Sequence, residues 1–508
     1  MPGGVCIQDT TYSMKIAALN PPFLPRYSRE SRSPAVAKSG TLYYPMWLAY
    51  AVGYLEKHGH EVLFIDAPAA GLSFEEIAAR IAAFSPALAV IDTSTPSIYS
   101  DVAAASGLKR RIPGLCTVLV GAHVSALPEQ TLLLDPSLDA VAYGEYEATV
   151  LDMAAVLSSG KGISGLAGVS GIAYRDSNGA IVRNCPREYI ENLDELPPVS
   201  MVYKKHLAIE PYFYGHSRHP LVVIMTGRGC PFHCTYCVVP QVLQGHRYRR
   251  RSVASVVEEF VFIRDIFPHA KEIMIEDDTL TADPKRCRDL SSALIEAHAT
   301  GIPWSANSRA DVDFHTMSAM KKAGCRLFCV GFESGDQEIL DNIRKGTSIE
   351  KIRRFVKDAR RAGILIHGCF MVGNRGETRT SLETTLRFAK ELNPDTAQFF
   401  PIMVYPGTSD YHYFKEKGWI VTEDFRKWLT EDGLHSSVVS NPDLSYETLV
   451  DFCDRARREF YLRPGYIAGK AVQVLRDPGE FNRLAKGFRT IFPYLLHRSL
   501  KRKPAASC

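Results

Sequence analysis

The stretch GRGCPFHCTYC at residues 227–237 places Cys230, Cys234 and Cys237 at the spacing C-x3-C-x2-C. The apolar run at residues 221–225 precedes it and is typical of a short strand, so a strand leads into a tight loop that carries three thiols. Three thiolates this close together can hold an iron–sulfur cluster. Because a [4Fe–4S] cluster has four irons, three cysteines leave one iron without a protein ligand, and a small molecule can bind there.

Two other interpretations of this loop are a zinc site and three buried thiols. Zinc normally takes four ligands, with its cysteines in paired C-x2-C-type spacing. His233 lies inside the loop but is badly placed to join its own neighbours as a fourth ligand. The spacing therefore favours the cluster.

The loop resembles the cluster motif of the radical S-adenosylmethionine (radical SAM) enzymes, in which an aromatic residue such as Tyr236 usually precedes the last cysteine. The resemblance implies that the open iron chelates the amino and carboxylate groups of S-adenosylmethionine (SAM). It also implies that an electron from the cluster cleaves SAM into methionine and a 5′-deoxyadenosyl radical. That electron would come from an external donor such as flavodoxin or ferredoxin.

The composition is that of an ordinary globular protein, with 46% hydrophobic and 23% charged residues among 508. This length predicts two or three domains. The net charge of +4 is small for the size and does not indicate a nucleic-acid partner. No secretory signal is visible, and no apolar stretch reaches the ~18–20 residues that span a membrane. We therefore expect a cytoplasmic protein whose thiols stay reduced.

Residues 14–160 alternate between predicted strands and helices. The strands lie at 14–22, 60–66, 87–92, 117–120 and 140–143, and the helices between them lie at 44–58, 74–84 and 98–111. This order predicts an α/β domain with a doubly wound, Rossmann-like parallel sheet, whose ligands bind at the carboxyl ends of the strands. The sequence has no G-x-G-x-x-G after the first strand and no G-x4-G-K-S/T, so it predicts neither a dinucleotide site nor a P-loop.

The layout of this domain is similar to the cobalamin-binding domain that precedes the barrel in one large subgroup of radical SAM enzymes. The matching segments are 20–22, 44–50, 94–96, 121–123 and 143–145. The resemblance implies bound cobalamin, with contacts from Ser94, Thr95, Gly121, His123, Tyr143, Gly144 and Glu145. The D-x-H-x-x-G signature that supplies a histidine to cobalt is absent. Because His123 lies in the different context GAHVS, we expect it to be hydrogen-bonded or structural and not to ligate cobalt.

Residues 161–215 are rich in glycine and are predicted to link the two domains. Within them, residues 176–179 read DSNG between two short β-prone runs, which predicts a hairpin. The segment is expected to tether the domains so that one ligand site faces the other.

Residues 216–410 contain six predicted strands, each followed by a helix. The strands lie near 221–225, 272–278, 304–309, 327–335, 364–373 and 396–404. This pattern predicts a partial (βα)6 barrel of the TIM type, with functional groups at the carboxyl ends of its strands.

The family resemblance assigns cofactor contacts to several of these strand ends. It implies that Glu333 faces the SAM ammonium, and that Asn307 and Arg309 approach the ribose and carboxylate. The resemblance also implies that the glycine-rich segment at Gly373 lies against the adenine of SAM. The other implied contacts are Tyr236, Glu276, Asp278, Gly331 and Ser334. The alternative for each single carboxylate is a helix cap or a surface ion pair.

Cys325 and Cys329 can share one face of a predicted strand, and Cys369 lies on the next strand. A second cluster is therefore one interpretation of these thiols. Buried apolar cysteines are commoner, and we favour that interpretation.

Residues 411–508 are predicted to be helical, with a last segment at 481–500 that combines aromatic, aliphatic and basic side chains. Such a helix can lie on an anionic membrane surface. It can equally pack on the barrel and leave its basic end in solvent. The first alternative implies peripheral contact with the inner face of the membrane and a lipid or isoprenoid substrate.

The main functional hypothesis is a cobalamin-dependent radical SAM methyltransferase that acts on an unactivated carbon of a small molecule or lipid. The resemblance implies that one SAM supplies the radical and a second re-methylates the cobalamin. A first alternative is a cobalamin-binding radical SAM cyclase, oxidoreductase or rearrangement enzyme. A second is a non-catalytic metal-binding module.

Overall fold

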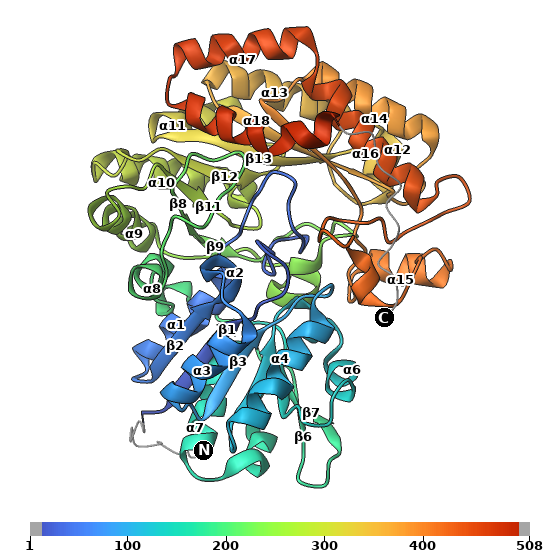
Figure 1. Ribbon diagram of the computed structural model, residues 1–508. Helices are drawn as coiled ribbons and strands as arrows, with labels where there is room; N and C mark the ends of the chain where they lie inside the picture. Colours follow the sequence, from blue (N-terminus) through green and yellow to red (C-terminus); the bar gives the residue numbers. More distant parts are fainter. Residues whose placement is uncertain (1–12, 497–508) are drawn as a thin grey trace, which may run out of the picture.

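A computed structural model of the chain describes residues 13–496. Two sheets, each covered by helices, follow one another along the sequence, and three further helices end the described part. In Figure 1 the first sheet (blue and cyan) lies below the second (green to yellow), and the red helices lie on the side of the second sheet away from the first.

The first sheet has the strand order β2-β1-β3-β4-β5-β6-β7, and its first five strands in this order run parallel. The strands are β1 (Lys15–Asn20), β2 (Glu61–Asp66), β3 (Leu88–Asp92), β4 (Cys116–Val120), β5 (Ala140–Ala142), β6 (Ile172–Arg175) and β7 (Ile181–Arg183). This arrangement confirms the predicted doubly wound domain.

Helices cover both faces of this sheet because successive strand residues point to opposite faces. In β1, Ile16 and Ala18 pack in the same core as the helices α1 and α7, whereas Ala17 and Leu19 pack with α3 and α4. The helices of this domain are α1 (Met46–Lys57), α2 (Ala67–Ala70), α3 (Phe74–Phe84), α4 (Ile98–Arg111), α5 (Ala122–Ala126), α6 (Pro128–Leu133) and α7 (Glu147–Ser158).

The predicted hairpin at residues 176–179 is present, but it does not stand alone between the domains. Its strands β6 and β7 are antiparallel, and β6 pairs with β5. The hairpin therefore extends the edge of the first sheet, because the backbone groups of β5 would otherwise lack partners on that side.

The second sheet contains six parallel strands in the order β15-β14-β13-β12-β11-β8, as predicted for a partial (βα)6 barrel. The strands are β8 (Leu221–Ile224), β11 (Glu272–Ile275), β12 (Trp304–Ser308), β13 (Cys325–Glu333), β14 (Leu365–Val372) and β15 (Thr396–Pro401). The helices of this region are α8 (Val199–His206), α9 (Val253–Ile266), α10 (Pro284–Glu296), α11 (Phe314–Lys322), α12 (Gln337–Asn342), α13 (Ile349–Ala362), α14 (Arg379–Leu392) and α15 (Ser409–Glu416).

Two short strands after β8 hold the cysteine loop against the first domain. They are β9 (Gly227–Arg228) and β10 (Arg249–Arg250), which pair antiparallel. Arg228 forms a buried ion pair with Glu147 at 2.6 Å, and Arg249 pairs with Glu145. These carboxylates lie at the start of α7, so the two domains meet through buried charges at the base of the loop.

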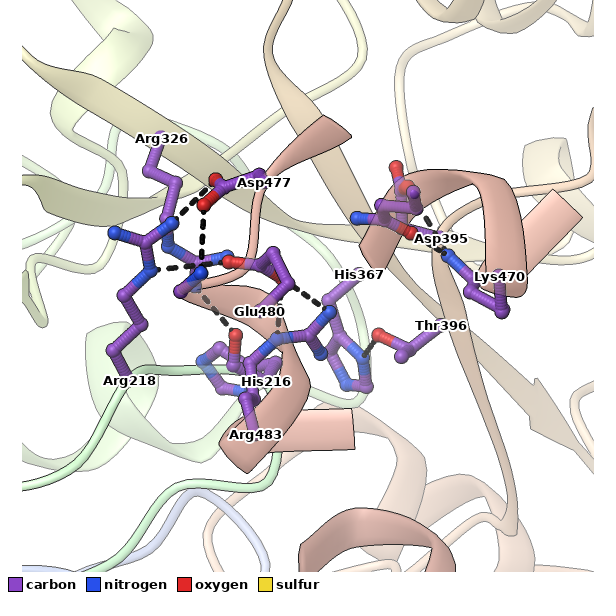
Figure 2. Close-up of polar contacts among 12 residues, drawn as sticks. His216, Arg218, Arg326, His367, Asp395, Thr396, Lys470, Asp477, Glu480 and Arg483 are labelled. Carbon is purple, nitrogen blue, oxygen red and sulfur yellow. Dashed lines mark hydrogen bonds and ion pairs between the residues drawn. The ribbon is translucent and has the colours of Figure 1, made fainter. Parts of the chain in front are cut away.

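The C-terminal helices α16 (Tyr446–Tyr461), α17 (Pro464–Arg476) and α18 (Glu480–Leu496) pack on the barrel. At the amino-terminal end of the strands, the buried carboxylate of Glu480 lies 3.1 Å from Arg218 Nε and 3.2 Å from Arg326 Nη1, and it also pairs with Arg483 (Figure 2). Arg326 in turn binds Glu272 at the start of β11. The first turn of α18 therefore closes the floor of the barrel.

The described part of α18 packs on the barrel through its first turn, while Phe481 and Phe488 of the same helix are exposed. The basic residues at 497–508 lie outside the described residues. No helix between residues 13 and 496 is both long and apolar enough to cross a bilayer.

Replacing Glu480 with Gln is expected to destabilise the protein by about 3–5 kcal/mol, because Arg483 would lose its buried counter-charge and Arg218 and Arg326 would each lose one of their carboxylates. Chemical denaturation at constant pH measures the change. The matched control is Glu431→Gln, which removes an exposed carboxylate. Equal stability of the two variants would contradict this account of the barrel floor.

Candidate functional site

The three cysteines of the loop lie at the carboxyl end of β8, where barrel enzymes place their chemistry. Cys234 is buried, Cys230 and Cys237 are half-buried, and all three are free thiols. Burial raises the pKa of Cys230 to about 11 and that of Cys237 to about 12. Metal binding to Cys230 and Cys237 must therefore release their protons.

The spacing of the three sulfur atoms fits a cluster better than a single ion. Their Sγ atoms do not all lie within 4.8 Å of one another. Ligands of one tetrahedral zinc ion, with bonds of about 2.0–2.3 Å, lie only about 3.5–3.8 Å apart. The loop is thus too open for a mononuclear zinc site, and its soft donors suit iron and sulfide.

Gly229 shapes the entrance of the loop. Its φ is +83°, and a Cβ there would lie 2.3 Å from the carbonyl oxygen of Arg247, so only glycine fits. Its N–H donates to Oδ2 of Asp278 at 3.1 Å. The predicted site residue Asp278 therefore lies beside the cysteine loop at the end of β11.

A hydrogen-bonded group of three side chains, Tyr236, Glu333 and Lys345, lies next to the cysteine loop. The Tyr236 hydroxyl donates to Oε1 of Glu333 at 2.9 Å, and Lys345 Nζ lies 2.8 Å from the same oxygen. Glu333 has a φ of +63°, and a Cβ at Gly331 would lie 2.2 Å from Oε1. Gly331 is thus required for the carboxylate to fold back toward Tyr236. Lys345 was not identified from the sequence, because nothing local marks it.

Asn307 and Arg309 occupy the end of β12, as predicted. Asn307 Nδ2 donates to Oε1 of Glu276 at 3.1 Å. The Arg309 guanidinium lies over the ring of Phe232, 3.6 Å from its centroid, and its Nη1 is 3.9 Å from Sγ of Cys234. Both residues therefore lie within the group that surrounds the cysteines.

Ser334 and Gly373 have structural contacts at the next two strand ends. The buried Ser334 hydroxyl bonds Thr385 at 3.0 Å. Gly373 has a φ of +88°, and its N–H donates to Oε2 of Glu377 at 3.1 Å. Burial raises the pKa of Glu377 to about 7. Glu377 thus organises the turn that follows β14.

Arg32 comes from the first domain and reaches the barrel mouth. Its Nη1 lies 3.0 Å from Oδ1 of Asp278, and its Nε lies 3.9 Å from Glu276. The loop that carries it lies between the two domains in Figure 1. Arg32 could not be identified from the sequence, because its partner Asp278 lies 246 positions further along the chain.

A pocket lies between the carboxyl ends of the first sheet and the barrel. Its lining includes Ser94, Thr95 and Gly121 of the predicted cobalamin contacts. It also includes Val238 and Val239, which directly follow the last cluster cysteine. The ligand site of the first domain therefore adjoins the cysteine loop.

The wall of this pocket carries polar groups that a ligand could bind. Gly121 has a φ of +112°, and a Cβ there would lie 2.6 Å from the Thr93 carbonyl oxygen. Oδ2 of Asp92 and Nε1 of Trp47 are buried without hydrogen-bond partners among residues 13–496. Burial raises the pKa of Asp92 to about 8, which favours its protonated form. Unpartnered buried groups at a cavity wall suit a ligand that bonds them.

The other predicted cobalamin contacts lie behind this wall. His123 is buried, bonds Oγ1 of Thr95 at 3.2 Å and meets the ring of Phe425 edge-on. Burial lowers its pKa to about 3. Tyr143 bonds the Asn184 carbonyl, and Glu145 is held by the arginines at the base of the cysteine loop. Gly144 donates its N–H to Ser125 at 3.0 Å.

Of the thiols considered for a second cluster, Cys325 is fully buried, whereas Cys329 and Cys369 are half-buried on neighbouring strands. Cys325 does not belong to the group that Cys329 and Cys369 form.

Two protein-family models match the chain. The Radical SAM superfamily matches residues 224–389, and the B12 binding domain matches residues 32–154. The first span contains the cysteine loop, and the second contains the cavity residues Ser94, Thr95 and Gly121.

The chain is 34% identical over 449 residues to a protein named Uncharacterized methyltransferase PH0819 from Pyrococcus horikoshii, which covers 86% of this chain and 94% of that protein. It is 28% identical to the anaerobic magnesium-protoporphyrin IX monomethyl ester cyclase of Rubrivivax gelatinosus, over 76% of this chain and 68% of that enzyme. Among solved structures, the radical SAM methyltransferase TsrM from Kitasatospora setae, with cobalamin and a [4Fe–4S] cluster bound, superposes with a TM-score of 0.67 at 17% identity. That match covers 89% of this chain and 90% of TsrM, and it concerns the fold.

His123→Gln is expected to make the protein less sensitive to acid. The folded pKa of about 3 lies below the ordinary value of 6.5, so between these values the unfolded chain binds a proton that the folded chain does not. Stability therefore falls as pH drops through this window, by up to about 1.4 kcal/mol per pH unit. Melting temperatures between pH 7.5 and pH 5 measure the slope. The exposed His315→Gln is the control, and an unchanged slope in His123→Gln would contradict the prediction.

Proposed function

This chain belongs to the radical SAM enzymes that carry a cobalamin-binding domain, and we propose that it methylates an unactivated carbon of a small-molecule substrate. Its cofactors are a [4Fe–4S] cluster, SAM and cobalamin. One observation carries the proposal: the cavity of the first domain is lined by Val238 and Val239, the residues that follow Cys237. A corrin in that cavity and a cluster in the loop would be direct neighbours.

In this proposal Cys230, Cys234 and Cys237 hold the cluster. When bound, the reduced cluster supplies the electron that cleaves SAM, and the corrin supplies the methyl group. The chain's own groups position the reactants around the open corner of the cluster. An external protein such as flavodoxin or ferredoxin delivers the electron.

Glu333 and Tyr236 are proposed to bind the SAM ammonium. The contact of Lys345 Nζ with Glu333 at 2.8 Å supports this role, because it is an ammonium group already held at that carboxylate. Arg309 lies against Phe232 and near Cys234, where its fork can bind the SAM carboxylate. Asn307 can reach the ribose from the end of β12, and Gly373 can back the adenine from the end of β14.

On the other side of the loop, the protonated Asp92 and the Trp47 indole are proposed to donate hydrogen bonds to the polar edge of cobalamin. Gly121 leaves room for the ligand to approach the backbone. Ser94 and Thr95 complete this wall. Tyr143, Gly144 and Glu145 support it from behind, and His123 acts by holding Thr95.

The proposed reaction is tested by anaerobic assay of the reconstituted enzyme with SAM and a reductant. Wild type is expected to form 5′-deoxyadenosine, and Cys234→Ala is expected to lose both this product and the cluster iron. Cys287→Ala removes a buried thiol distant from the loop in sequence and is the matched control. Iron retained by Cys234→Ala, or no SAM cleavage by wild type, would favour the non-catalytic metal-binding module.

The products also separate methylation from the alternative raised by the cyclase relative. Both reactions produce 5′-deoxyadenosine. Only methylation produces S-adenosylhomocysteine in comparable amount, because a second SAM must restore the methyl group. Turnover without S-adenosylhomocysteine would identify a cyclase, oxidoreductase or rearrangement enzyme.

We also propose that the enzyme works in the cytoplasm and touches the inner membrane face through α17 and α18, which favours a lipid or isoprenoid substrate. Exposed apolar side chains on these helices support this proposal: Ile467, Val472, Leu475, Phe481 and Phe488. Basic residues such as Arg476 and Arg489 accompany them, and such a mixture suits an anionic lipid surface.

Flotation with vesicles rich in anionic lipid tests the membrane contact. The double variant Phe481→Ser/Phe488→Ser is expected to bind less than wild type, because it removes buried apolar area from the lipid interface. Leu133→Ser, which changes another exposed apolar residue, on α6, is the control. Equal flotation of all three proteins, or none in wild type, would exclude contact through these side chains.

A further inference from the structure

A second group of metal-binding side chains lies inside the barrel, apart from the cluster loop. One ligand atom each from Cys329, His367 and Cys369 lies within 4.8 Å of the other two. Cys329 is on β13, and the other two residues are on β14. Cys329 is the register partner of His367, and Gly331 is the partner of Cys369, so the group is built across one parallel strand pair.

These three side chains face the interior of the barrel. Along β14, the half-buried Leu365, His367 and Cys369 alternate with the buried Ile366 and Phe370. Phe370 packs in the outer core, where its ring lies 5.6 Å from that of Phe332. Because successive strand residues point to opposite faces, the half-buried set lines the inside of the barrel.

His367 is held in an orientation that suits metal binding. Its Nδ1 bonds Oγ1 of Thr396 at 2.7 Å (Figure 2). With Nδ1–H donating to this hydroxyl, Nε2 keeps its lone pair for a metal. The imidazole of His216 stacks on His367 at 4.8 Å and 19°, so the ring has little freedom to turn.

A second observation marks the same region as a site. His216 is buried, and its Nε2 has no hydrogen-bond partner among residues 13–496. A buried ring nitrogen without a partner is costly unless a ligand or water satisfies it. His216 lies on the floor side, since its carbonyl accepts from Arg326 Nη2 at 2.6 Å (Figure 2).

We propose that Cys329, Cys369 and His367 form a mononuclear zinc site with an open fourth position. Two thiolates and one imidazole are soft to borderline donors, which select zinc over magnesium or calcium. A tetrahedral zinc requires ligand atoms about 3.5–3.8 Å apart, so side-chain rotations of about 1 Å close the site. Binding converts two thiols to thiolates and releases two protons.

We assign the fourth position to the side of this group that faces the carboxyl strand ends. Cys369 is close enough to Glu333 and Lys345 for their charges to act on its thiol. If the proposed function holds, this is where the substrate lies, and the metal takes an oxygen or nitrogen donor of the substrate. This last step rests on the proposed function, whereas the metal site itself does not.

Zinc-edge X-ray absorption on the full-length holoenzyme tests the site, because this edge does not detect iron or cobalt. The expected spectrum has two sulfurs at about 2.3 Å and at least one nitrogen at about 2.0 Å. One zinc per chain is expected by elemental analysis. Thr396→Val is expected to weaken zinc binding by about tenfold, because it removes the group that orients His367.

Cys329→Ser and Cys369→Ser are expected to lose zinc while keeping the cluster iron, and Cys287→Ser should keep both metals. A variant without the cluster ligands, Cys230→Ala/Cys234→Ala/Cys237→Ala, should still bind one Co²⁺ with thiolate-to-metal absorption in the cobalamin-free state. If this variant does not fold, the zinc-edge spectrum of wild type still tests whether the zinc has two sulfur ligands and a nitrogen ligand.

The proposal would be overturned if wild type bound less than one zinc per chain. It would also be overturned if Cys329→Ser and Cys369→Ser both kept their zinc, or if zinc were lost only when the cluster cysteines were replaced. None of these measurements needs turnover. A missing zinc site is therefore distinguishable from a missing methyltransferase activity.

Discussion

The buried ion pairs between the two domains are the constraint on which the rest of the site depends. Arg228 binds Glu147 at the start of α7, and Arg249 binds Glu145 just before it. Both arginines belong to the short strand pair that carries the cysteine loop. Leaving one of these buried charges unpaired costs about 3–5 kcal/mol, so the loop is held in one place relative to the first sheet. As a result, the cavity of one domain and the thiols of the other become parts of a single site.

Parallel strands explain why so many functional groups meet there. Each sheet brings its carboxyl ends to one edge, and the two edges face each other across the cavity. Glycine is needed at close approaches, such as Gly229 beside the Arg247 carbonyl and Gly331 beside Glu333. The positive φ of Glu333 is local strain, which persists because Tyr236 and Lys345 hold the carboxylate.

The C-terminal helices give the barrel a charged floor. An open barrel exposes the amino-terminal ends of its strands, and here Glu480 neutralises Arg218 and Arg326 at that end. The interior above this floor carries His367 and the thiols of two strands, whereas the outer face of the same strands is aromatic and dry. The division follows from the two-residue period of a strand, which separates reactive from structural side chains.

The sequence by itself determined the two α/β domains, their strands and the cluster loop, because βα periodicity and the C-x3-C-x2-C spacing are local signals. SAM and cobalamin followed from the resemblance of these segments to a known family. It also placed Asp278, Asn307 and Glu333 at strand ends, since strand boundaries can be predicted from local patterns. It did not reveal Arg32 or Lys345 beside the site, nor that the hairpin at 176–179 completes the first sheet. It left open whether the last helix covers the barrel. Only the tertiary structure decided these points, because each depends on contacts between segments far apart in the chain, which local patterns do not encode.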